Sequence, residues 1–100
     1  MFKNILIGLL IASSSAFAHS AIMSCFDEGD GSVTCEGGFS DGSSASGVKF
    51  YIEQDGKKVI SGKMNEDSEF NFKKPNGTYS AVFDAGEGHQ VSISGKDITE

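Results

Sequence analysis

The sequence predicts an all-β fold, a small antiparallel β-sandwich of seven strands, and three observations predict it. Apolar and polar residues alternate along most of the chain after residue 18. Glycine, asparagine and aspartate recur at short intervals between the alternating segments, as they do in tight turns. No stretch there has the apolar spacing of an amphipathic helix.

The first two strands are expected at 21–27 and 32–39, separated by the turn sequence DEGDG. The Ser- and Gly-rich segment 40–47 then forms a flexible loop. Two further strands, at 48–54 and 57–63, meet at a tight hairpin turn formed by Asp55-Gly56. The acidic DEGDG turn lacks the twelve-residue ligand spacing of a calcium loop.

The last three strands are expected around Phe70 and Phe72, at 79–83 and at 89–94. Alternation in these segments is typical of half-buried strands in an antiparallel sheet. The tail at 96–100 is expected to fray. The intervening turns lie at 65–68, 75–77 and 85–88.

Residues 1–18 have the pattern of a cleaved secretory signal peptide. Lys3 precedes an apolar run at 5–12, and the segment ends in Ala-Phe-Ala. The run is too short for a permanent membrane anchor. Cleavage after Ala18 leaves one domain, 19–100, which is expected to be periplasmic or secreted.

The charge of this domain disfavours several classes of function. Its seven lysines stand against fourteen acids, with no arginine, which gives a net charge of −7. Such a surface repels phosphate backbones and anionic lipid, so neither nucleic-acid binding nor membrane insertion is expected. A domain of 82 residues is also too short for most catalytic scaffolds, and we expect a binding protein rather than an enzyme.

Cys25 and Cys35 are the only cysteines, and export favours a disulfide between them. A turn centred near Asp30 places them opposite each other, within disulfide reach. The alternative is a pair of thiolate metal ligands.

Two histidines, His19 and His89, suggest a metal site. After cleavage His19 would offer its α-amine and ring nitrogen to one metal, and His89 from a glycine-rich turn would add a third nitrogen, forming a histidine brace. Met23 and Asp84 are weaker candidate ligands, and Asp84 or Glu87 would orient the imidazole. Each candidate also has an alternative interpretation. His89 is then an ordinary surface residue, His19 stands at the new N-terminus by chance, and Met23 belongs to the strand core.

The segment 62–83, GKMNEDSEFNFKKPNGTYSAVF, resembles the later strands of carboxypeptidase-regulatory or transthyretin-like sandwiches, although Ser68 stands where that pattern prefers glycine. Over the mature chain, His19, EGGFSDG, KFYIEQDGK and the final DAGEGH resemble the small soluble periplasmic components linked to nickel and cobalt uptake transporters. This resemblance implies a sandwich that binds Ni²⁺ or Co²⁺ through His19 and His89 and assists a membrane permease. The cysteine pair departs from that pattern, since thiols or Met23 would favour copper.

Three alternative functions remain open at this point. A periplasmic copper carrier resembling the CopC type also begins with histidine and carries a late one. A metal-free structural or adhesive sandwich predicts that neither histidine matters. A histidine-brace oxygenase is disfavoured, because the small domain offers little surface for a polymeric substrate.

The metal hypothesis depends on cleavage after Ala18, because any other cut moves His19 off the terminus or removes it.

Overall fold

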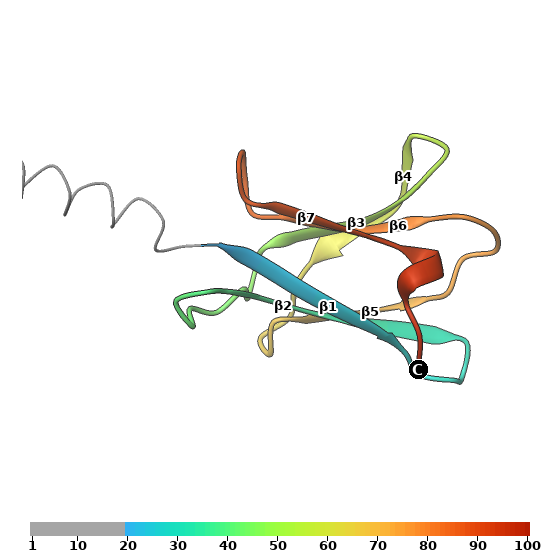
Figure 1. Cartoon of the computed structure of the whole chain (residues 1–100), viewed down its shortest axis with the longest axis horizontal. Helices are drawn as coiled ribbons and strands as arrows, with labels where there is room; N and C mark the ends of the chain where they lie inside the picture. The colour runs from blue at the N-terminus through green and yellow to red at the C-terminus, as the bar shows by residue number, and fades with distance from the viewer. Residues whose placement is uncertain (1–19) are drawn as a thin grey trace, which may run out of the picture.

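The computed structural model describes residues 20–100, which form two antiparallel β-sheets packed face to face (Figure 1). The predicted signal peptide and His19 lie outside these described residues. The elements are β1 (Ala21–Asp27), β2 (Ser32–Phe39), β3 (Lys49–Gln54), β4 (Lys57–Lys63), β5 (Glu69–Lys73), β6 (Ser80–Asp84), β7 (Gln90–Ser94) and the 3₁₀ helix η1 (Gly95–Asp97). The predicted all-β sandwich of seven strands is therefore confirmed.

Three strands form one sheet in the order β1-β2-β5, and four form the other in the order β4-β3-β6-β7. All five strand pairs are antiparallel. The alternation seen in the sequence becomes the two faces of each sheet. In β3, Phe50 and Ile52 are buried, whereas Lys49, the first residue of the strand, is exposed. The buried core is formed by Val33, Cys35, Ala45, Phe50, Ile52, Met64, Phe72, Tyr79, Ala81, Phe83 and Ile98.

Aromatic rings join the two sheets at the centre of this core. Phe50 on β3 stacks on Phe70 of β5, with ring centroids 4.5 Å apart, and lies 5.8 Å from Phe72. Tyr79 meets Phe72 edge to face at 6.1 Å. Such ring pairs add to the stabilisation that burial of apolar area alone provides.

Ser68 shows how the chain tolerates a residue where the transthyretin-like pattern prefers glycine. Its φ of 61° lies in the left-handed region, which glycine adopts without strain. The serine hydroxyl accepts the backbone N–H of Ala45 at 2.9 Å, and Ala45 is fully buried. Ser68 thus fixes the middle of the 40–47 loop to the core, an interaction that glycine could not make.

The prediction that the tail at 96–100 frays is wrong. Ile98 is only 7% exposed and belongs to the core. The N–H of Asp27 donates to the carbonyl oxygen of Thr99 at 2.9 Å, which holds the C-terminus beside the β1–β2 turn (Figure 1). A single isoleucine among polar neighbours gives no periodic pattern from which its burial could be predicted. The free energy gained by burying its side chain offsets the conformational entropy that the tail loses when it becomes ordered.

Candidate functional site

The β6–β7 turn presents His89 at one end of the sandwich. Gly86 and Gly88 in this turn have φ values of 110° and 80°, which glycine adopts readily. The N–H of His89 donates to the carbonyl oxygen of Gly86 at 2.9 Å, and the His89 carbonyl oxygen accepts the Ala85 N–H at 3.0 Å. The backbone of His89 is therefore fixed on both sides while its side chain is exposed.

The side chain of His89 lines a shallow, open depression of about 260 Å³. Ala85 contributes from the same turn. Phe39 at the end of β2, together with Asp41 and Ser43 from the loop that follows, lines the rest. The depression is thus built where the ends of the two sheets meet, and it places a carboxylate on the same surface as the imidazole.

The residue before β1 is hydrogen-bonded to the loop that lines this depression. The N–H of Ser40 donates to the Ser20 carbonyl oxygen at 2.8 Å, and the N–H of Ser20 donates to the Ser40 hydroxyl at 2.9 Å. Ser40 lies between Phe39 and Asp41, which both line the depression. In Figure 1 the start of β1, the loop after β2 and the β6–β7 turn all lie at the left end of the sandwich.

Asp41 is held by its own loop. Its Oδ1 accepts the backbone N–H of Ser43 at 3.0 Å and the Ser43 hydroxyl at 2.7 Å. The same arrangement occurs at the far end of the molecule, where Asp30 Oδ1 accepts the N–H of Ser32 at 2.9 Å and its hydroxyl at 2.7 Å. Asp41 was not among the site residues predicted from the sequence. The available signal was the repeated Asp-Gly-Ser, which predicts the turn but not the proximity to His89.

The structure does not bring Asp84 to the His89 depression. Asp84 follows the buried Phe83, so alternation turns its side chain to the outer face of the four-stranded sheet. A hydrogen bond from Gln90, the N–H of Gly86 at 3.0 Å and the positive charge of Lys49 lower the pKa of this carboxyl. Its described interactions therefore hold the turn rather than the imidazole, and Glu87 is exposed in the same turn.

Met23 does not line the His89 depression either. It lies on the inner face of β1 opposite Gly37 and packs, half-buried, against the core. This placement agrees with the alternative in which Met23 belongs to the strand core.

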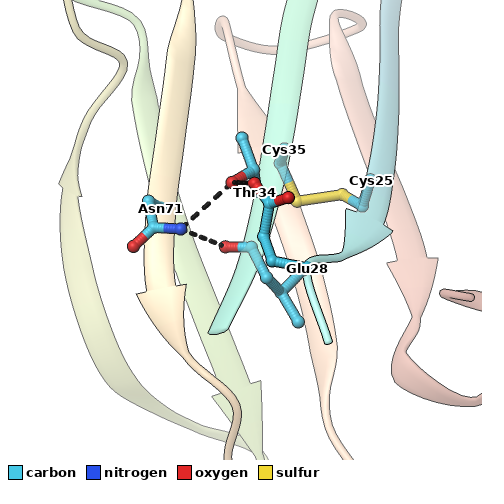
Figure 2. Close-up of a disulfide and its surroundings, with 6 residues drawn as sticks. Cys25, Glu28, Thr34, Cys35 and Asn71 are labelled. Atoms are coloured by element: carbon cyan, nitrogen blue, oxygen red, sulfur yellow. Dashed lines mark hydrogen bonds between the residues drawn. A yellow bond between two sulfur atoms is a disulfide. The ribbon is translucent and has the colours of Figure 1, made fainter. Parts of the chain in front are cut away.

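The predicted disulfide is present. Cys25 and Cys35 face each other across β1 and β2, with Cα atoms 4.0 Å apart. Figure 2 shows this bond beside Thr34, whose hydroxyl donates to the Glu28 carboxylate at 2.6 Å. Because both sulfurs are bonded to each other, the alternative of two thiolate metal ligands does not describe this structure.

A separate group of acids lies on the outer face of the three-stranded sheet. Glu36 on β2 is the register partner of Glu69 on β5. Desolvation, a hydrogen bond that the protonated Glu69 donates to the Glu36 carboxylate, and the negative charges of Glu36 and Asp67 raise the pKa of Glu69. The folded chain therefore holds the proton of Glu69 to a higher pH than the unfolded chain does.

We expect Glu69→Gln to raise the unfolding midpoint at pH 7. A raised carboxyl pKa means that this glutamate costs stability once pH has risen through its folded pKa, and the amide removes that cost. The advantage should disappear below about pH 4, where the wild-type carboxyl is protonated in both states. Thermal unfolding of wild type, Glu69→Gln and the exposed control Glu66→Gln between pH 3 and 8 tests this; equal midpoints for all three at pH 7 would contradict it.

Comparison with known proteins gives no match: no family model, curated protein or solved structure matches the chain. Within residues 20–100, no three His, Cys, Asp or Glu side chains come together as a metal site. No helix in that part of the chain has the length and apolar character needed to cross a membrane. The His89 depression is lined by two potential ligand side chains, those of Asp41 and His89.

Proposed function

We propose that the chain is a periplasmic accessory protein that binds one divalent transition metal ion, Ni²⁺ or Co²⁺, and passes it to a membrane permease. The metal is its cargo, and no chemical reaction is involved. His19, as the first residue after signal cleavage, supplies its α-amine and imidazole nitrogens, and His89 supplies a third nitrogen. The nickel and cobalt assignment rests on the family resemblance of the sequence.

One observation supports this arrangement most directly, the pair of hydrogen bonds between Ser20 and Ser40. They hold Ser20 against Ser40, whose chain neighbours Phe39 and Asp41 line the same depression as His89. His19 is joined to Ser20 by one peptide bond, and consecutive Cα atoms are about 3.8 Å apart. A mature N-terminus at His19 would therefore start one residue before Ser20, which is hydrogen-bonded to the loop that lines the His89 depression, although His19 and His89 are 70 positions apart in the sequence.

The placement of the sulfur atoms disfavours a Cu(I) site and is compatible with nickel or cobalt. Soft sulfur ligands select copper, above all Cu(I). The two cysteines form a disulfide, and Met23 packs against the core. No sulfur atom lines the described His89 depression, which offers imidazole, hydroxyl and carboxylate groups instead. The disulfide also suits an oxidising compartment such as the periplasm.

Native mass spectrometry of the protein exported to the periplasm tests the proposal. We expect a mass that begins at His19 and one bound Ni²⁺ or Co²⁺ per chain. His89→Ala should weaken this binding by about 100-fold or more, since even the loss of a group that only orients a ligand costs about 10–100-fold. Ser92→Ala, on the outer face of β7, is the matched control and should bind like wild type.

Other outcomes separate the alternatives. Equal binding by wild type and His89→Ala, or no binding by wild type, overturns the metal proposal and favours a metal-free interaction module. Since Cu²⁺ binds more tightly than Ni²⁺ at most nitrogen sites, affinity alone does not identify the cargo. Metal content after native purification does, and copper there would support the copper carrier.

A further inference from the structure

We infer that Asp41 is the third protein side chain of this metal site, alongside His19 and His89, and that it makes the site a mixed nitrogen and oxygen site. This inference rests on the function proposed above. It adds a negatively charged ligand to the site. Neither the histidine pattern nor the family resemblance assigns a carboxylate ligand.

Asp41 and His89 come from different sheets but line one depression. Asp41 lies in the loop after β2, and His89 lies in the turn before β7. Ser40, the neighbour of Asp41, is the residue that holds Ser20 through two hydrogen bonds. Two consecutive residues of the loop after β2 therefore have different roles. Ser40 holds the residue before β1, and Asp41 supplies the carboxylate.

The Asp41 carboxylate is oriented before any ion arrives. Ser43 donates two hydrogen bonds to Oδ1, one from its backbone N–H and one from its hydroxyl. Ser43 itself lines the depression. Groups that fix a metal ligand in this way reduce the entropy lost on binding and tune the affinity of the site.

The chemistry of a carboxylate also suits this cargo. The amine and the two imidazoles are neutral when they bind a metal, so a site of nitrogens alone would leave the full charge of the ion uncompensated. One carboxylate removes one unit of that charge, and its oxygen is a harder donor than nitrogen or sulfur. We therefore expect Asp41 to favour divalent Ni²⁺ and Co²⁺ over Cu(I).

Calorimetric titration of Ni²⁺ into the mature protein tests the role of Asp41. Asp41→Asn keeps an oxygen that accepts the Ser43 hydrogen bonds, so the turn is retained while the charge is lost. We expect its Ni²⁺ affinity to fall by about 10-fold or more, in the range known for weakened metal sites. Asp30→Asn is the matched control, because Asp30 makes the same turn with Ser32 at the opposite end of the molecule.

The outcomes distinguish this inference from the proposed function. If His89→Ala loses Ni²⁺ while Asp41→Asn and Asp30→Asn both bind like wild type, Asp41 is not a ligand but the histidine site stands. If Asp30→Asn weakens binding as much as Asp41→Asn, the effect is one of general surface charge and the inference fails. If wild type binds no Ni²⁺, the proposed function and this inference fail together. Thermal unfolding of each variant shows whether it is folded.

Discussion

Reduction of the disulfide is expected to lower the free energy of unfolding by about 3 kcal/mol. The bond closes a loop between residues separated by 10 positions, and in the chain-entropy model a cross-link of that length removes this much freedom from the unfolded chain. The loss is large for this chain, because a domain of this size has a total stability of about 4–12 kcal/mol. Urea unfolding of the oxidised and reduced wild-type protein measures the difference.

The control for this prediction is the double variant Cys25→Ala/Cys35→Ala. Its stability should not respond to reductant, and it should match or fall below that of the reduced wild type, since the missing sulfur of the fully buried Cys35 leaves a small cavity. A difference below about 1 kcal/mol between oxidised and reduced wild type would contradict the prediction. It would mean that the unfolded chain keeps this hairpin closed without the bond.

The disulfide also restrains β1, the strand that follows the proposed N-terminal ligand. β1 is an edge strand, paired on one side with β2. The disulfide ties the middle of β1 to β2, and the Ser20–Ser40 hydrogen bonds tie its start. The proposed N-terminal ligand is therefore carried by a strand that is fixed covalently and held again next to the site.

The fold was largely predictable because strand alternation and turn residues are local signals. All seven expected strands are present, and their ends differ from the expected ones by about one residue where they differ. The burial of Ile98 was not predictable, because one apolar residue in a short polar tail carries no period. The left-handed φ of Ser68 was not predictable from the serine itself. The only sign of it was that the transthyretin-like pattern prefers glycine at this position.

The candidate site was predictable only in part. His89 in its glycine-rich turn stood out as a residue type with a known chemistry. Asp41 did not, because its position beside His89 follows from which strands end at the same end of the sandwich, and a loop rich in serine and glycine gives no sign of its neighbours. Asp84 is closer to His89 in the sequence, but strand alternation turns it to the outer face.

Phe50→Ala is expected to lower the free energy of unfolding by about 3–5 kcal/mol, the usual cost of removing a buried aromatic ring. Phe50 is 1% exposed and stacks on Phe70 from the opposite sheet, so its loss leaves a cavity at the point where the two sheets meet. Because this cost approaches the whole stability of a small domain, the variant should be partly unfolded at 25 °C. Urea unfolding followed by circular dichroism measures the effect.

Two further variants show whether the cost comes from the cavity. Val59→Ala truncates an apolar side chain that is 49% exposed on the edge strand β4, and it should change stability by less than about 0.5 kcal/mol. Phe50→Leu refills most of the space and should recover much of the loss. If Phe50→Ala costs no more than Val59→Ala, the stacked rings are not what holds the sheets together. In that case the disulfide and the hydrogen-bonded strand pairs would have to account for the stability of the sandwich.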